Sequence, residues 1–160
     1  MTADSAATPV RSIALTTLAD TLAFGRKLGR QLTAGDLVIL SGSLGAGKTA
    51  LTKGIGDGMG VAGPITSPTF VLARVHPAGP VGVRLVHVDA YRLAGTLEFD
   101  DLDLDTDLTA CAVVVEWGEG VADQLADARL VIGLERLPND ARVATLTPIG
   151  GDWAERIAGF

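Results

Sequence analysis

Residues 36–49 read DLVILSGSLGAGKT, and this stretch decides the fold class. Its first part, 36–41, is a short apolar run typical of a buried strand. Its second part, from Gly42 to Thr49, matches the phosphate-loop pattern G-x-x-x-x-G-K-[ST] at every fixed position. We expect a helix to begin near Lys48 and to end at the glycines of residues 54–60. A strand, this loop and a helix in succession predict a site for a nucleoside triphosphate.

The loop has the chemistry needed to hold phosphate. Its glycines let the backbone turn N–H groups inward, and the start of the following helix adds partial positive charge. Lys48 is expected to reach the β- and γ-phosphates, and the Thr49 hydroxyl to bind a Mg²⁺ ion that bridges them. The alternative, a glycine-rich turn with a chance lysine, is disfavoured by the flanking strand and helix. The residues predicted to bind nucleotide here are Gly42, Ser43, Leu44, Gly45, Ala46, Gly47, Lys48, Thr49 and Ala50.

Leucines at roughly helical spacing predict a helix over residues 17–33. Thr17 is suited to its N-cap. Gly25 and Gly29 weaken the prediction, because a glycine inside a helix costs about 1 kcal/mol relative to alanine. The leucines expected to share one face are Leu18, Leu22, Leu28 and Leu32.

Five further segments are predicted to be strands, because each is rich in Val, Leu, Ile or Thr and is bounded by turn residues. Several follow one another through short glycine or proline links with no room for a crossover helix, so part of the sheet must be antiparallel. We therefore expect an α/β fold of the P-loop NTPase kind, with a mixed parallel and antiparallel central sheet flanked by helices. The segments are 69–76, 83–88, 112–116, 129–135 and 141–147.

Length and composition limit the class of protein. The chain has 160 residues, 48% of them apolar and 20% charged, so we expect one globular domain over 12–160 behind a flexible tail at 1–11. No apolar run approaches the ~18 residues of a membrane span, and the first residues lack the features of a signal peptide. Cys111 is the single cysteine and there are two histidines, which excludes a disulfide within the chain and a spaced zinc set. We expect a cytoplasmic protein that does not engage a membrane.

The charge balance restricts the possible partners. The net charge is −6, with 19 acidic against 13 basic residues, which disfavours an independent grip on the phosphates of nucleic acid. DNA binding is therefore not expected, and contact with RNA would need help from another protein. A nucleotide site is compatible with this charge, because it needs only local donors and a metal ion.

Two apolar strands end in an acidic residue, which is where P-loop proteins place the groups that complete the metal site and orient water. Residues 84–89 run into Asp89, and residues 112–116 run into Glu116. Both are candidate catalytic residues. The alternative is that each acid simply marks the exit of a strand to solvent and the start of a turn.

Three hydroxyls surround a proline in Thr66-Ser67-Pro68-Thr69-Phe70, a composition suited to a loop that senses a γ-phosphate or its metal. Ser67 and Thr69 are the candidates there, and an ordinary turn is the alternative. Trp117, beside Glu116, is suited either to stack on a base or to fill the core, and from the residues alone core packing is favoured.

An acidic segment at 98–107 resembles a Ca²⁺ loop only superficially. Thr106 stands where such a loop needs glycine, and Ala112 where it needs a bidentate glutamate. A solvated acidic loop is favoured, with a docking surface for a basic partner as the alternative.

Four motifs occur in succession along the chain: the phosphate loop, Ser67-Pro68-Thr69-Phe70, His87-x-Asp89-x-Tyr91-Arg92-Leu93 and Glu116-Trp117. In order and spacing they closely resemble the TsaE family of bacterial ATPases. The resemblance covers about residues 12–135. Members of that family support synthesis of threonylcarbamoyladenosine, the modification beside the anticodon in tRNAs that read codons beginning with A, and act with the proteins TsaB and TsaD.

The resemblance implies a role for each matching residue. Lys48 holds phosphate, and Thr49 and Glu116 serve Mg²⁺. Asp89 helps to orient or activate water. Ser67 and Thr69 line a switch-like loop, and Trp117 flanks the nucleotide.

Two positions depart from the family pattern. Ser43 stands where an aspartate is usual, and the acidic segment before Cys111 lacks the usual glycine and aromatic pattern. Ser43 is not a fixed position of the phosphate loop, so nucleotide binding should persist, whereas the acidic segment alters a surface that could face partners.

The resulting expectation is an ATP hydrolase that uses ATP and Mg²⁺, is slow alone, and acts with TsaB-like and TsaD-like partners that bring it to tRNA. A small-molecule kinase would use the same loop but needs a lid with arginines, and only Arg92 lies near a motif. A nucleotide-occupancy switch with little hydrolysis is the other alternative. A guanine-specific GTPase is disfavoured, because no N-K-x-D element occurs.

Overall fold

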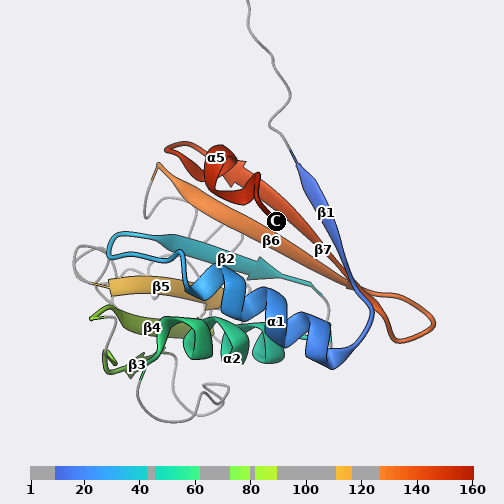
Figure 1. Ribbon diagram of the computed structural model, residues 1–160, viewed down its shortest axis with the longest axis horizontal. Helices are drawn as coiled ribbons and strands as arrows, with labels where there is room; N and C mark the ends of the chain where they lie inside the picture. The colour runs from blue at the N-terminus through green and yellow to red at the C-terminus, as the bar shows by residue number, and fades with distance from the viewer. Residues whose placement is uncertain (1–9, 43–45, 62–72, 80–81, 90–110, 117–126) are drawn as a thin grey trace, which may run out of the picture.

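This computed structural model describes residues 10–42, 46–61, 73–79, 82–89, 111–116 and 127–160. The described residues form a seven-stranded sheet in the order β1-β7-β6-β2-β5-β4-β3, with helices packed on it (Figure 1). The elements in chain order are β1 (Arg11–Leu15), α1 (Leu18–Gly29), β2 (Leu37–Ser41), α2 (Lys48–Met59), β3 (Ala73–His76), β4 (Arg84–Asp89), β5 (Cys111–Glu116), β6 (Arg129–Arg136), β7 (Arg142–Ile149) and α5 (Trp153–Ile157).

The sheet is parallel at its centre and antiparallel towards both edges. β2 runs parallel to β5 and β6, and β4 runs parallel to β5. β1 pairs with β7, β7 with β6, and β3 with β4, all antiparallel. Two of these antiparallel pairs, β3–β4 and β6–β7, are joined by short links, as expected, whereas β1–β7 brings together segments from the two ends of the chain. The mixed sheet expected from the sequence is therefore confirmed.

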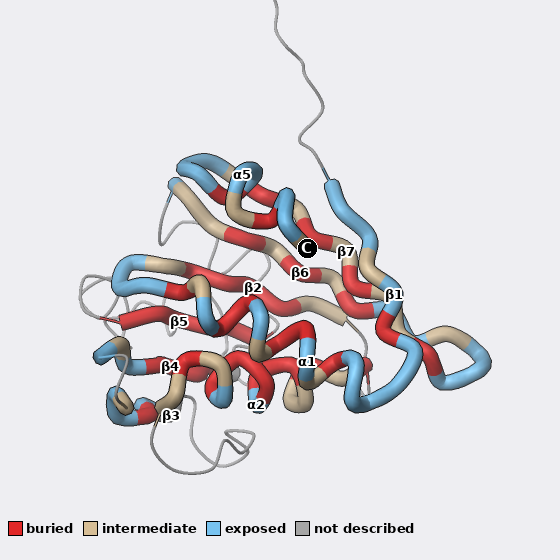
Figure 2. The backbone as a smooth tube through the Cα atoms, in the orientation of Figure 1, coloured by how far each residue is buried: buried red, intermediate tan, exposed pale blue. Residues whose placement is uncertain are grey.

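The central strands are buried on both faces, as continuous apolar runs require. Figure 2 shows β2 and β5 in the buried colour along most of their length. Leu37 to Leu40 have no exposed surface, and all of β5 is buried. The loop of the site follows β2 directly, so it starts from a buried strand that is paired on both sides.

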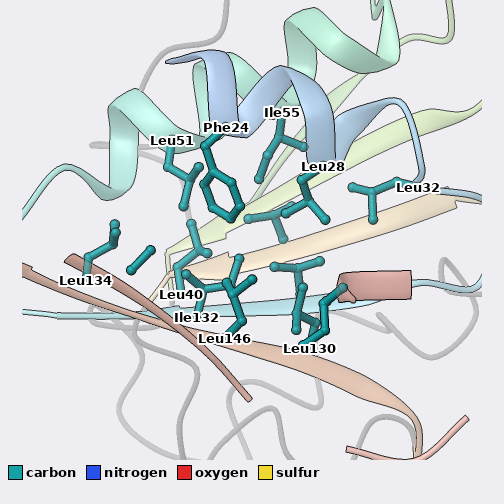
Figure 3. Close-up of a cluster of buried hydrophobic side chains, with 14 of the residues drawn as sticks. Phe24, Leu28, Leu32, Leu40, Leu51, Ile55, Leu130, Ile132, Leu134 and Leu146 are labelled. Atoms are coloured by element: carbon teal, nitrogen blue, oxygen red, sulfur yellow. The ribbon is translucent and has the colours of Figure 1, made fainter. Parts of the chain in front are cut away.

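The main core lies between the sheet and the helices α1 and α2, which lie side by side on one face (Figure 1). Figure 3 shows side chains from both helices pointing towards those of β2, β6 and β7. The labelled members of this core are Phe24, Leu28, Leu32, Leu40, Leu51, Ile55, Leu130, Ile132, Leu134 and Leu146.

Glycines let α1 and α2 approach closely enough for their backbones to touch. A Cβ atom added at Gly29 would lie 2.2 Å from the carbonyl oxygen of Ile55, and one at Gly25 would lie 2.7 Å from that of Leu51. From the opposite side, a Cβ at Gly54 would lie 2.6 Å from the Leu22 oxygen, and one at Gly58 would lie 2.2 Å from the Arg26 oxygen. We call Gly25, Gly29, Gly54 and Gly58 the glycine seam.

The helix predicted over 17–33 is present but shorter, and its buried face differs from the leucine face expected. Thr17 is the N-cap, as predicted, and forms a capping box with Asp20. Leu18 is 65% exposed whereas Leu28 and Leu32 are buried, so the leucines expected to share one face do not all lie in the core. The buried face contains Thr21, Phe24, Gly25, Leu28 and Gly29, because the seam with α2 sets the rotation of the helix.

Two elements were absent from the sequence expectations. β1 begins at Arg11, a residue assigned to the flexible tail, and pairs along its whole length with β7. α5 packs its Trp153 and Ile157 into the main core. Arg156 fixes α5 to the turn before β2, since its guanidinium donates to both carboxylate oxygens of Asp36 at 2.7 and 3.0 Å. These hydrogen bonds raise the pKa of Arg156 despite its partial burial, so the ion pair persists.

Candidate nucleotide site

The phosphate loop leaves the sheet at the end of β2 and enters α2 at Lys48. Gly42 begins the loop with φ +139°, and a Cβ atom there would lie 2.5 Å from the carbonyl oxygen of Leu134 on β6. Gly47, the residue before α2, has φ +105°. Both conformations favour glycine strongly, so two fixed glycines of the motif are required by the backbone itself.

The start of α2 has the features of an anion site. Gly47 is its N-cap and supplies no side-chain hydrogen bond, and the first turn contains no acidic residue. Lys48 is 5% exposed, and its ammonium donates to the carbonyl oxygen of Gly42 at 2.8 Å. A cation at a helix N-terminus interacts unfavourably with the helix dipole. The negative charge of a bound phosphate would offset this, because it is attracted both to the Lys48 ammonium and to the N-terminus of α2.

Both candidate acids stand at the edge of the sheet from which the loop departs. In the parallel strands, Leu40 is paired with Glu116, and Glu116 is paired with Asp89. The ends of β2, β5 and β4 therefore lie in register beside one another (Figure 1). Glu116 is 5% exposed, so it does not simply mark an exit to solvent. The side chain of Asp89 lies outside the described residues.

Glu116 has a buried partner that the sequence did not identify. The Nε2 atom of His87 on β4 contacts the Oε2 atom of Glu116 on β5, and the His87 side chain is fully buried. The other ring nitrogen of His87, Nδ1, is buried without a hydrogen-bond partner among the described residues. His87 was noted only as part of a motif, because a contact between strands depends on sheet register and not on spacing along the chain.

Arg142 is a second residue that sequence reasoning missed. It begins β7, yet its Nε atom lies 3.7 Å from the position of a Cβ added at Gly47. Its guanidinium also donates to the carbonyl oxygen of Asp140 in the β6–β7 turn. The turn therefore brings a cationic side chain beside the phosphate loop. No local pattern signals this, because the two segments are far apart in sequence.

Other predicted site residues differ in how far the structure describes them. Ala46 is fully buried, whereas Thr49 and Ala50 are partly exposed at the start of α2. The remaining candidates lie outside the described residues, as does the acidic segment 98–107; they are Ser43, Leu44, Gly45, Ser67, Thr69 and Trp117.

The donors available for a cation suit Mg²⁺. Thr49 offers a hydroxyl oxygen and Glu116 a carboxylate, and Mg²⁺ prefers oxygen ligands and keeps few protein ones when it binds with phosphates. Within the described ranges, no cluster of three or more His, Cys, Asp or Glu side chains is arranged to hold a metal.

The strand, glycine-rich loop and helix, set in a mixed sheet with acids at the neighbouring strand ends, define the P-loop class of α/β proteins. The model of the family described as "Threonylcarbamoyl adenosine biosynthesis protein TsaE" matches residues 15–144. The chain belongs to the TsaE family.

Curated relatives agree with this assignment. A tRNA threonylcarbamoyladenosine biosynthesis protein TsaE of Streptomyces coelicolor is 55% identical over 135 residues, covering 81% of this chain and 91% of the relative. Its counterpart of the same name in Mycobacterium tuberculosis is 58% identical, covering 79% and 80%. The crystal structure of Bacillus subtilis YdiB matches with a TM-score of 0.77 at 28% identity, covering 94% of this chain and 93% of that one.

Among the described residues, no helix is long and apolar enough to span a membrane.

Proposed function

We propose that this chain is a Mg²⁺-dependent ATPase subunit that supports threonylcarbamoyladenosine modification of tRNA in the cytoplasm. The observation that carries the proposal is the buried carboxylate of Glu116, which is paired in register with Leu40 at the sheet edge where the phosphate loop begins. A buried acid is costly unless it is paired or binds a cation, and Glu116 is both paired with His87 and close to the loop expected to hold phosphate and its metal. The names of the relatives connect the site to tRNA modification.

Each residue of the proposed nucleotide site would have its own role in binding or hydrolysis. The loop backbone and Lys48 bind the phosphates, and Thr49 and Glu116 hold the metal that arrives with them. Asp89, whose strand ends beside that of Glu116, orients the attacking water. Bound Mg²⁺ supplies neutralisation of the charge that develops on the phosphate oxygens. Ser67 and Thr69 would line a switch-like loop, and Trp117 would flank the nucleotide.

Partners of the TsaB and TsaD kind would couple hydrolysis to the modification. The net charge of −6 gives this chain a poor surface for tRNA, so recognition of tRNA would be supplied by the assembled complex. The energy of hydrolysis would be used to reset the tRNA-modifying complex, and this chain would not make the modified base itself.

The proposal is tested first at Lys48. Lys48→Ala should weaken ATP binding on the order of 10- to 100-fold and abolish turnover, because it removes a charge-assisted hydrogen-bond donor. Lys53→Ala is the matched control, since Lys53 is exposed on the same helix. Calorimetric ATP titration and phosphate release would be measured on both folded variants. Unchanged binding and turnover in Lys48→Ala would refute the nucleotide site.

A second test separates binding from hydrolysis. Glu116→Ala and Asp89→Ala should reduce ATPase activity in the assembled complex more than they reduce ATP affinity, because both serve metal and water instead of the phosphate cradle. Glu135 is an exposed acid on β6, so Glu135→Ala should change neither ATPase activity nor ATP affinity. Full activity in either site variant would remove that residue from the mechanism.

A further inference from the structure

We propose that His87 is a positioning residue, which holds the carboxylate of Glu116 for the metal by donating a hydrogen bond from Nε2. This inference rests on the proposed function, because it gives Glu116 the task of serving Mg²⁺. The contact joins adjacent parallel strands, with His87 on β4 and Glu116 on β5.

The proposed metal site assigns one role to the imidazole. As a metal ligand, Glu116 is an ionised carboxylate, which only accepts hydrogen bonds, so the ring would donate to Glu116 Oε2 from a protonated Nε2. Among the described residues, Nδ1 has no hydrogen-bond partner, so the contact with Glu116 is the one polar contact of the ring in this part of the chain. Packing in the sheet holds the imidazole in place beside Glu116.

Burial makes a purely structural role a poor explanation. His87 is fully buried and leaves Nδ1 unsatisfied, whereas its neighbours in the sheet, Leu85 and Val114, fill the same face with apolar groups. An apolar residue at position 87 would pack without that unsatisfied nitrogen. What an apolar residue could not do is restrain the Glu116 side chain.

The contact also leaves Glu116 able to bind a cation. The hydrogen bond engages Oε2, and among the described residues no hydrogen bond engages Oε1. The Glu116 side chain keeps 6% of its surface exposed, so it is not sealed from the site. A carboxylate held at one oxygen loses less freedom when the other binds metal, which is how partners behind metal ligands raise affinity.

Two carboxamide substitutions isolate this hydrogen bond. The amide nitrogen of His87→Gln reaches about as far as Nε2, whereas that of His87→Asn stops near the position of Nδ1. We expect His87→Asn to raise the Mg²⁺ concentration needed for half-maximal tightening of ATP binding by about 10- to 100-fold. His87→Gln should recover most of this loss, and ATP binding without Mg²⁺ should be the same in wild type and both variants.

The outcomes distinguish this inference from the proposed function. If wild type shows no Mg²⁺-dependent ATP binding, the proposed function itself fails. If ATP binding by wild type depends on Mg²⁺ and a folded His87→Asn variant shows the same dependence, the positioning role is wrong. The positioning role is also wrong if His87→Gln and His87→Asn weaken the Mg²⁺ dependence equally.

A measurement on the unaltered chain covers the case in which His87→Asn does not fold. Nitrogen-15 NMR of the ring should show His87 protonated on Nε2 in the free protein and after addition of ATP with Mg²⁺. A ring protonated on Nδ1 alone would overturn the proposal, because it could not donate to Glu116.

Discussion

Gly42 shows how a motif residue can be required by the fold before any ligand binds. Its φ of +139° is strained for other residues, and an added Cβ atom would lie 2.5 Å from a backbone oxygen of β6 that has little room to move. The first glycine of the loop therefore secures the contact between the loop and the neighbouring strand.

We predict that Gly42→Ala lowers the free energy of unfolding by about 2 kcal/mol, from backbone strain and the clash with Leu134. Urea denaturation followed by circular dichroism measures this. Gly133→Ala is the control, because its Cβ would meet only the Ser41 hydroxyl at 3.6 Å, and it should change stability by less than about 0.5 kcal/mol. Equal effects of the two substitutions would contradict the interpretation.

The β6–β7 turn contains a carboxylate that can be followed by pH. Arg136 donates to Asp140 from Nε at 3.0 Å, and this hydrogen bond holds the pKa of Asp140 below its ordinary value of 3.8. A lowered pKa means that the contact stabilises the turn above the ordinary carboxyl pKa and is lost as the pH falls through the lowered pKa.

Carbon-13 NMR should therefore find the Asp140 midpoint below 3.8. Arg136→Gln should move it upward towards that value, because the hydrogen bond and the charge are both removed. Lys53→Gln removes a charge from α2 instead and should leave the midpoint in place. A midpoint that does not respond to Arg136→Gln would show that the contact does not form in solution.

At the scale of elements, the glycine seam joins the helix that leaves the phosphate loop to the helix before it. The seam glycines lower helix propensity, yet they permit contact between two backbones that no larger residue allows. Packing outweighs propensity here, which is why α1 forms although its sequence carries two glycines.

Gly29→Ala should lower the free energy of unfolding by about 1–3 kcal/mol, because the added methyl forces the helices apart. Gly159→Ala is the control, since nothing lies within 4 Å of its Cβ position. Thermal unfolding compares the two. Because α2 begins in the phosphate loop, Gly29→Ala should also weaken ATP binding, which Gly159→Ala should not. If Gly29→Ala is as stable as wild type, the close approach of the helices is not strictly required.

At the scale of the whole molecule, the charge predicts dependence on partners. The isolated chain should hydrolyse ATP slowly. It should also bind free tRNA poorly, because few basic residues are available to release counterions from the RNA. Adding TsaB-like and TsaD-like proteins should raise the rate, since contact can order a catalytic loop.

Phosphate release would be measured for the chain alone, with tRNA and with both partners, at matched salt. Tight tRNA binding by the chain alone, or an ATPase rate that neither partner changes, would contradict the predicted dependence on partners.

The sequence predicted those parts of the fold that have strong local patterns. β2, the phosphate loop and α2 combine an apolar run, fixed glycines and a lysine in one continuous stretch, and the mixed sheet followed from link lengths. β1 and α5 have five residues each, and only Leu15 of β1 is buried, so neither carries a periodic signal.

The contacts between distant residues could not be predicted in the same way. His87 and Glu116 are 29 residues apart, and their meeting depends on which strands pair and in which register. Arg142 reaches the phosphate loop because β6 pairs with β2 and β7 turns back to pair with β6. The exposure of Leu18 did not follow from the leucine spacing, because the partner helix sets the rotation of α1.

The glycine seam also limits how this chain can evolve. At Gly25, Gly29, Gly54 and Gly58, the atoms nearest an added Cβ belong to the backbone of the opposing helix. A larger residue on one helix therefore cannot be accommodated by a smaller side chain on the other, because no side chain is there to be trimmed. Second-site suppressors should be absent from the facing helix, and a mutational scan should show these positions depleted of every substitution whatever the genetic background.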